Sequence, residues 1–215
     1  MKEFKMLAKT LFGLEDVLAK ELIELGANNV QIFRRAVSFT GNLELMYKAN
    51  LCCRTALRIL KPIASFKAAS ADEVYEEVKK IDWTEYLDLK KTFTIDSTIY
   101  SETFKHSKFV TYRVKDAIAD QFVQKYSRRP SVSIDKPDLY INVHISHKDC
   151  TVSLDSSGES LHKRGYRVHQ TEAPISEVLA AGMLLMAGWK GQSNFVDPMC
   201  GSGTFIIEAL MMLTD

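Results

Sequence analysis

The segment from Asp197 to Thr204 gathers the residue types that most readily form a ligand site. It reads Asp-Pro-Met-Cys-Gly-Ser-Gly-Thr and is followed by a mainly apolar run. Its two glycines permit positive φ and close approach of a ligand to the backbone, and Ser202 or Thr204 can cap the helix that the apolar run predicts. A helix that starts here offers free amides to a carboxylate or phosphate. The segment therefore predicts a ligand-binding turn between a strand and a helix.

The same segment excludes two nucleotide-binding motifs. The dinucleotide pattern G-x-G-x-x-G requires a third glycine where Ile206 stands, and the Walker pattern requires a G-K-[ST] sequence that is absent. Asp197 at the end of the expected strand would also repel a pyrophosphate. It suits a ligand with positive charge, and S-adenosylmethionine carries a cationic sulfonium and ammonium beside an anionic carboxylate. The charges of S-adenosylmethionine therefore fit this loop.

The net charge of +1 hides two segments of opposite charge. Ala71 to Asp88 has a local net charge of −5, whereas Lys105 to Lys136 has one of +5. Only the second segment suits contact with phosphates. A smaller basic cluster lies between His162 and Arg167, where three basic side chains suit contact with phosphates and a tyrosine suits stacking on a nucleobase. The candidate RNA-binding residues are Lys105, Lys108, Arg113, Lys115, Lys125, Arg128, Arg129, Lys163, Arg164, Tyr166 and Arg167.

Length and composition describe an ordinary globular chain. Its 215 residues are 46% hydrophobic and 26% charged, which predicts one large domain or two small ones. The four cysteines form no C-x-x-C pair and no Cys/His cluster has metal-ligand spacing, so we expect reduced thiols and no metal. The longest apolar run, Val178 to Trp189, is too short to span a membrane, and the N-terminus lacks the apolar stretch of a signal peptide. These features predict a cytoplasmic protein.

Hydrophobic periodicity predicts alternating strands and helices, with a change of character near Ser156-Ser157-Gly158. Beyond that point, a helix, a short apolar strand and a second helix resemble the opening of a doubly wound parallel sheet. The expected strands are Phe4 to Ala8, a bent or hairpin-like Val30 to Phe39, Thr92 to Tyr100, the hairpin Leu139 to Asp155, and Asn194 to Val196. The expected helices are Leu14 to Leu25, Leu43 to about Leu60, the acidic segment around Val74 to Ile81, Val110 to Tyr126, Ile175 to Gly188, and a last one to Leu213.

The segment Asp197 to Thr204 resembles the cofactor loop D-P-x-C-G-S-G-T of class I methyltransferases that modify amino groups of RNA and DNA. Upstream, His162 to Arg167 followed by Ala173-Pro174-Ile175-Ser176-Glu177 resembles the entry to the methyltransferase domain of THUMP-containing RNA guanine-N2 methyltransferases, which act on large-subunit ribosomal RNA. In that family, this entry segment helps to wall the cofactor pocket. The preceding elements are similar to the family's ferredoxin-like part and its RNA-binding THUMP domain.

The resemblance implies a fold class and a division of the chain. It implies an α+β N-terminal region, ferredoxin-like over 1–65 and THUMP over 66–155, then a connector over 156–173 and the truncated start of a Rossmann-like α/β methyltransferase domain over 174–215. RNA is the implied partner, ribosomal RNA first and tRNA second. The implied cofactor-binding residues are Asp197, Pro198, Cys200, Gly201, Ser202, Gly203, Thr204, Ala173 and Pro174.

One departure from the family limits what the chain is expected to do. The family's catalytic motif, Asn/Asp-Pro-Pro-Tyr, belongs downstream of the glycine loop, and this sequence stops eleven residues after Thr204. We therefore expect an N-terminal piece of a longer enzyme, inactive by itself, with no catalytic residue of its own.

Two other functions remain open. The chain could be an RNA-binding module, since THUMP domains also serve enzymes of thiolation and pseudouridylation that modify tRNA; the glycine loop argues against those enzymes. It could instead belong to a small-molecule or protein methyltransferase, which would not need the basic segment.

Overall fold

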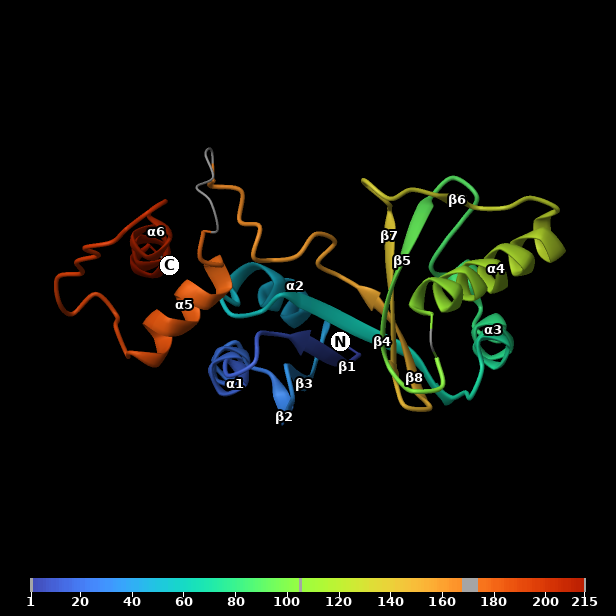
Figure 1. The fold of residues 1–215 in the computed structure, drawn as a ribbon, viewed down its shortest axis with the longest axis horizontal. Coiled ribbons are helices and arrows are strands. Elements are labelled where there is room, and N and C mark those ends of the chain that lie inside the picture. Colours follow the sequence, from blue (N-terminus) through green and yellow to red (C-terminus); the bar gives the residue numbers. More distant parts are fainter. Residues whose placement is uncertain (1, 105, 168–173, 215) are drawn as a thin grey trace. The chain divides into compact units, whose positions relative to one another are not determined.

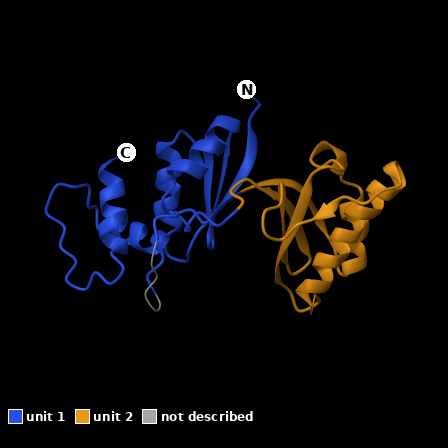
Figure 2. Ribbon diagram, turned by 90° about the horizontal axis from the view of Figure 1, so that it is seen from above, with its two compact units in different colours: residues 1–59, 159–215 blue, residues 60–158 orange. Residues whose placement is uncertain are grey.

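The computed structural model describes residues 2–104, 106–167 and 174–214, which form two compact units. Unit 1 combines Met1–Ile59 with Glu159–Asp215, and unit 2 is Leu60–Gly158 (Figure 2). Figure 1 gives the order of the helices and strands. Within the described ranges, the chain contains no helix whose length and apolar character would let it cross a lipid bilayer.

The N-terminal part of unit 1 has the element order of a ferredoxin-like domain. The elements are β1 (Phe4–Lys9), α1 (Glu15–Glu24), β2 (Asn28–Phe33), β3 (Ala36–Gly41), α2 (Leu43–Cys52) and the beginning of β4 (Arg58–Lys67). β3 pairs antiparallel with both β1 and β2. Met6 and Phe39 point from the sheet into a core that Leu18 and Leu22 close from α1, because residues four apart share one helix face.

The C-terminal part of unit 1 adds α5 (Glu177–Met186) and α6 (Thr204–Leu213), which pack against each other. α5 also packs against the ferredoxin-like part, at the point where Gly182 faces Leu14. A Cβ atom at Gly182 would lie only 2.6 Å from the Leu14 side chain, so glycine is what lets this helix approach so closely. α5 and α6 thus pack with the ferredoxin-like part in one compact unit.

The expected strand at Asn194 to Val196 is wrong. These residues form no ladder with any described strand, and the Val196 side chain is 79% exposed. A strand needs a neighbour to satisfy its backbone groups, and none of the described residues offers one. The preceding turn is held locally instead, since Trp189 Nε1 donates to the Ser193 carbonyl at 3.2 Å and Phe195 packs on the Trp189 ring.

Unit 2 is a sheet of order β4-β8-β7-β5-β6 with helices α3 (Ala71–Lys79) and α4 (Ser107–Tyr126) on one side (Figure 1). The other strands are β5 (Thr92–Tyr100), β6 (Ser131–Val132), β7 (Leu139–Ser146) and β8 (Asp149–Asp155). β5 runs parallel to β7 and β6, whereas β8 is antiparallel to β7 and β4. Val114, Ile118 and Phe122 of α4 are fully buried, as their spacing predicts.

The helix expected from Leu43 to about Leu60 ends early, at Cys52, and β4 begins at Arg58. The cause is a contact from another element: the Glu21 carboxylate of α1 accepts hydrogen bonds from the Arg54 amide at 2.6 Å and from the Thr55 amide at 3.1 Å. These two amides are therefore bonded to α1 and not to a continuing helix. A tertiary contact overrides the local pattern here.

Candidate functional site

The expected ligand loop runs from Asp197 to Gly203 and leads directly into α6. Asp197 Oδ1 accepts a hydrogen bond from the Met199 amide at 3.1 Å, and the Gly203 amide donates to the Cys200 carbonyl at 2.7 Å. Gly203 is the N-cap residue of α6, whose Ile207 amide donates to the Gly203 carbonyl at 2.9 Å. Pro198 and Cys200 are exposed beside it. The loop is thus a short turn at a helix N-terminus.

The loop fits a small ligand that approaches its backbone. Gly201 and Gly203 have φ angles of 51° and 74°, and a Cβ atom at either position would meet no heavy atom within 4 Å. Glycine is therefore favoured by the backbone, and the space beside it is open. The amides in the first turn of a helix have no intrahelical partner. In α6, no side chain among the described residues caps them. With the half-buried Asp197 carboxylate nearby in the chain, these groups suit a ligand that carries both a carboxylate and a cation.

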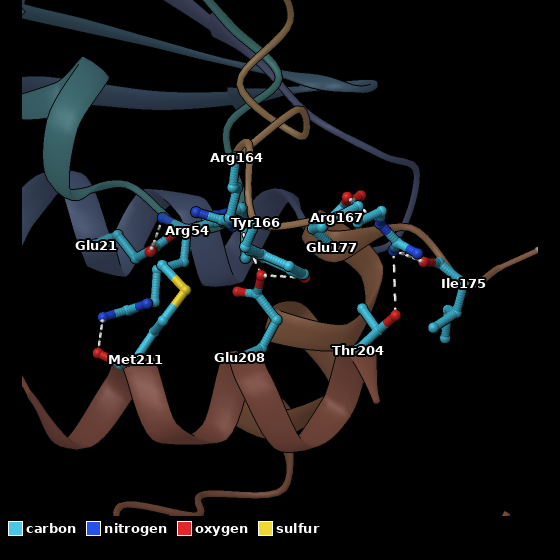
Figure 3. A network of polar contacts seen from close by, with 11 residues as sticks. Glu21, Arg54, Arg164, Tyr166, Arg167, Ile175, Glu177, Thr204, Glu208 and Met211 are labelled. Atoms are coloured by element: carbon cyan, nitrogen blue, oxygen red, sulfur yellow. Dashed lines mark hydrogen bonds and ion pairs between the residues drawn. The ribbon is translucent and has the colours of Figure 1, made fainter. Parts of the chain in front are cut away.

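Ser202 and Thr204 do not cap α6 as the sequence suggests. Their hydroxyls lie 3.2 Å from each other and accept hydrogen bonds from the Arg167 guanidinium, Ser202 Oγ from Nη1 at 3.3 Å and Thr204 Oγ1 from Nη2 at 3.1 Å. The Arg167 Nε donates to Glu177 Oε1 at 2.5 Å, and Nη2 also donates to the Ile175 carbonyl at 2.7 Å. Arg167 thus joins the glycine loop to the beginning of α5 (Figure 3).

A second network ties α6 to the ferredoxin-like part of unit 1. Arg164 Nε lies 3.0 Å from Glu208 Oε1, and its Nη2 donates to the Arg54 carbonyl at 2.6 Å. The Arg54 Nη2 in turn donates to the Met211 carbonyl at 2.6 Å, in the last turn of α6. The Tyr166 hydroxyl donates to Glu208 Oε1 at 3.0 Å. Figure 3 shows the side chains of Arg54, Arg164 and Tyr166 turned toward α6.

Burial shifts the acidity of two groups in this network. It raises the pKa of Glu208 above its usual value, although Arg164, the Tyr166 hydroxyl and Arg54 favour the carboxylate. Burial and the neighbouring Glu208 carboxylate also raise the pKa of the Tyr166 hydroxyl. The hydroxyl therefore remains a proton donor to Glu208 at any physiological pH.

A cavity of about 440 Å³ lies beside these residues in unit 1. Its described lining comes from His162, Lys163, Gly165 and Arg167 of the connector and from Pro174 to Glu177 at the start of α5. Pro174, which we expect in the cofactor site, therefore lines this cavity. Arg167 lines the same cavity and also contacts Ser202 and Thr204 of the glycine loop. Ala173, the other connector residue expected there, lies outside the described residues.

The basic residues of unit 2 divide into two groups. Arg113 is held in place, with Nη2 2.8 Å from Asp72 Oδ1 and its guanidinium 4.2 Å from the centre of the Tyr75 ring. Lys115 Nζ lies 3.4 Å from Asp116 Oδ1 and 5.4 Å from the centre of the Tyr112 ring. The second group is exposed to solvent and consists of Lys108, Lys125, Arg128 and Arg129. Lys105 lies outside the described residues.

The basic cluster of the connector is placed differently from what the sequence suggests. Lys163 is exposed, but the side chains of Arg164 and Arg167 are each only 13% exposed and are bound to the buried carboxylates of Glu208 and Glu177. Tyr166 is half-buried with its hydroxyl on Glu208. The two arginines are therefore neutralised within unit 1, where they contribute little to the attraction of RNA.

Sequence reasoning missed the two carboxylates that receive these cations, Glu208 and Glu177. Glu208 did carry a signal, since it is the single charged residue in the otherwise apolar α6. A lone acid on an apolar helix is expected to find a buried partner. In the described part of the chain, no three His, Cys, Asp or Glu side chains are grouped as ligands for a metal ion.

Three domain families match the chain in order. The RlmL ferredoxin-like domain matches residues 5–60, the THUMP domain residues 68–155 and the RMKL-like methyltransferase domain residues 164–215. The chain therefore combines a ferredoxin-like domain, a THUMP domain and a segment of a methyltransferase domain.

Individual relatives are more specific. A protein of Synechocystis sp. whose name describes it as an RNA methyltransferase is 46% identical over 197 residues, which is 92% of this chain and 51% of the relative. The ribosomal RNA large subunit methyltransferase K/L of Syntrophotalea carbinolica is 43% identical over 215 residues, which is 98% of this chain and 30% of the relative. The chain thus spans about half the length, or less, of these curated relatives.

A solved structure is similar over almost the whole chain. SMU.472, complexed with SAH, superposes with a TM-score of 0.85 at 35% identity, and the match covers 99% of this chain and 56% of that one.

Proposed function

We propose that this chain supplies the RNA-binding part and the first cofactor-binding segment of a cytoplasmic methyltransferase. The reaction transfers a methyl group from S-adenosylmethionine to the exocyclic N2 of a guanine in large-subunit ribosomal RNA. In this proposal, residues 1–65 are the ferredoxin-like part, 66–155 the THUMP domain, 156–173 the connector and 174–215 the start of the methyltransferase domain.

The observation that carries the proposal is the glycine loop at the start of α6, inside the segment that matches the RMKL-like methyltransferase domain. Its open backbone positions at Gly201 and Gly203 and the uncapped amides of α6 suit the carboxylate of S-adenosylmethionine, and Asp197 suits its cationic groups. The solved relative complexed with SAH, the demethylated cofactor, supports the same assignment.

S-adenosylmethionine supplies, when bound, a methyl group on a cationic sulfur that an amine can attack directly. The rate of such a displacement depends largely on the alignment of amine and methyl group. The task of Asp197, Gly201, Gly203 and the first turn of α6 is therefore to hold the cofactor in one orientation. We assign no catalytic base to this chain.

RNA contact is assigned to the exposed cations of the basic segment, Lys108, Lys125, Arg128 and Arg129, and to Lys163 of the connector. Cations of this kind bind phosphates without reading the sequence, and so position the RNA. The THUMP match over 68–155 includes the first four of them and supports their role in binding RNA.

The proposal is tested by incubating the full-length protein with methyl-labelled S-adenosylmethionine and unmodified transcripts of large-subunit RNA, small-subunit RNA and tRNA. Digestion to nucleosides followed by mass spectrometry should find N2-methylguanosine in the large-subunit transcript alone. Methylation of tRNA instead would favour the tRNA-modifying alternative. RNA binding without any methyl transfer would favour a stand-alone RNA-binding module, and label on another atom would refute the assignment to guanine N2.

A further inference from the structure

We infer that the ferredoxin-like part of unit 1 positions the cofactor loop, and that Arg54 is the residue through which it does so. Arg54 contacts the last turn of α6, whereas the glycine loop lies at the other end of the same helix. It is therefore a positioning residue that acts through α6, without contact to the ligand. The inference gives the ferredoxin-like part a role besides RNA binding, and it rests on the proposed function because it concerns the same loop.

Both backbone polar groups of Arg54 are held in place. The residue lies between α2 and β4, where its amide donates to Glu21 Oε1 at 2.6 Å and its carbonyl accepts a hydrogen bond from Arg164 Nη2 at 2.6 Å. Only 9% of Arg54 is exposed. Its side chain therefore reaches α6 from a backbone that is itself fixed by α1 and by the connector (Figure 3).

The Arg54 side chain supplies a cation that the end of α6 lacks. The carbonyls of the last helical turn have no intrahelical amide as partner, and the partial negative charge there favours a cation. α6 has no basic residue of its own in its last turn. Arg54 Nη2 donates to the Met211 carbonyl at 2.6 Å, and the Thr214 hydroxyl donates to the same carbonyl at 3.3 Å. The cation at this helix end thus comes from a residue 157 positions earlier in the chain.

A second contact with the ferredoxin-like part runs through α5. This helix approaches the buried Leu14 so closely that a Cβ atom at Gly182 would lie 2.6 Å from the Leu14 side chain. α6 packs on α5 in turn. The ferredoxin-like part therefore supports α6 at two places, directly at Met211 and indirectly through α5, so it fixes the direction of the helix as well as its place.

The direction of α6 decides where the glycine loop is presented. The helix has ten residues, and Met211 lies eight residues after Gly203, which is about 12 Å along the axis. Rigid helices transmit a displacement from one end to the other. A ligand that is held by several groups at once loses affinity when those groups are misplaced by even a small distance. Loss of the contact at Met211 should therefore weaken cofactor binding at the loop.

The test measures S-adenosylmethionine affinity of the full-length protein by calorimetry. Arg54→Met removes the charge and the N–H donors but keeps an unbranched stem, and it should raise Kd by about fivefold, the lower end of the usual coupling between two sites. Arg54→Lys keeps a cation and a donor for the Met211 carbonyl, so its Kd should stay close to that of wild type. Arg34→Met removes the same charge at an exposed position of the ferredoxin-like part and should leave Kd unchanged.

Val37→Ala separates positioning from a general loss of stability. Val37 is fully buried in the core of the ferredoxin-like part, so alanine leaves a cavity and destabilises that part. Its Kd should equal that of wild type, and a rise as large as that of Arg54→Met would overturn the inference. If Arg54→Met does not fold, Arg54→Gln takes its place with the same expected direction, because its shorter neutral side chain keeps N–H donors but lacks the charge and the reach.

A second measurement does not need the cofactor. Amide hydrogen exchange in α6 should be faster in Arg54→Met than in wild type and in Arg54→Lys, because the end of the helix is released; equal rates in all three would overturn the inference. An unchanged Kd in Arg54→Met, in a protein whose wild-type form binds S-adenosylmethionine, would overturn it alone. A wild-type protein that binds none would contradict the proposed function as well.

Discussion

Replacing Arg164 by methionine should leave Glu208 buried without its ion-pair partner. The Arg164 Nε lies 3.0 Å from Glu208 Oε1, and the two side chains are 13% and 0% exposed. Methionine keeps an unbranched stem that fills most of the same space, but it loses the charge and the hydrogen bond to the Arg54 carbonyl. The main consequence is therefore electrostatic, and it falls on the contact between α6 and the rest of unit 1.

The expected loss of stability is large. Removing one partner of a buried ion pair costs about 3–5 kcal/mol, because the other charge stays in the interior. Glu208 keeps the hydrogen bond from the Tyr166 hydroxyl, which favours the lower part of that range. A domain is stable by only about 5–15 kcal/mol, so Arg164→Met should weaken unit 1 measurably at neutral pH.

The loss should depend on pH. Burial already raises the pKa of Glu208, against the influence of Arg164. A carboxyl group with a raised folded-state pKa binds its proton more tightly when folded, so the folded state loses stability as pH rises from the unfolded-state pKa to the folded-state pKa. Removing Arg164 raises the pKa further. The difference in unfolding free energy from wild type should therefore grow as pH rises above the folded-state pKa of Glu208 in the wild type, and level off above the higher pKa in the variant, by at most ~1.4 kcal/mol per pH unit.

Urea unfolding at a series of pH values, with hydrogen exchange of α6 amides as a local probe, measures this difference. In the Glu208→Gln background, the effect of Arg164→Met should be small and nearly independent of pH, and Lys163→Met provides an exposed neighbouring control. A penalty that is equal at both ends of the pH range, or as large in the Glu208→Gln background as in the protein that retains Glu208, would refute the reasoning.

Three further predictions use other parts of the chain. Gly203→Val in the full-length protein should weaken S-adenosylmethionine binding in calorimetry, because a side chain at φ 74° costs about 1–2 kcal/mol and fills the open space; Gly188→Val, at φ 69° beyond the end of α5, controls for the backbone strain and should leave Kd unchanged. Charge reversal at Arg128 and Arg129 should weaken RNA binding and flatten the fall of log affinity with log salt, whereas reversal of the exposed Lys5 and Lys20 in unit 1 should do neither. Burial raises the pKa of the Cys150 thiol to about 11, so alkylation at mildly alkaline pH, followed by mass spectrometry, should label the exposed Cys52 and Cys200 well before Cys150; equal labelling rates in the native protein would contradict this.

The elements that the sequence predicted correctly are those whose pattern is local. Thr92 to Tyr100 alternates as a strand must and forms β5, and Leu139 to Asp155 forms the hairpin of β7 and β8. The glycine loop is local too, since Gly201 and Gly203 adopt the positive φ that their residue type permits. These features depend on neighbours in the chain, which the sequence displays directly.

The wrong predictions concern segments whose structure depends on contacts with residues far away in the sequence. The helix that starts at Leu43 ends at Cys52 because Glu21, more than thirty residues away, binds the amides of Arg54 and Thr55. The apolar run at Asn194 to Val196 has the composition of a strand but no strand beside it in the described chain. The pairing of Arg164 with Glu208 joins residues that no periodicity connects, so the sequence alone could not show that this cation is structural.

Burial and pairing therefore determine which of the basic residues can attract RNA. A charge count treats Arg113 and Arg128 alike, yet Arg113 is committed to Asp72 and Tyr75, whereas Arg128 is exposed one residue after the left-handed turn at Ser127 that ends α4. Cations already paired at short range add little to the field that attracts phosphate, because their partners cancel it. The attraction of RNA by unit 2 should therefore come from the exposed cations Lys108, Lys125, Arg128 and Arg129, and not from the basic segment as a whole. Substitutions that remove equal charge at Arg113 and at Arg128 should consequently differ, the first acting on the contact between α3 and α4 and the second on affinity for RNA.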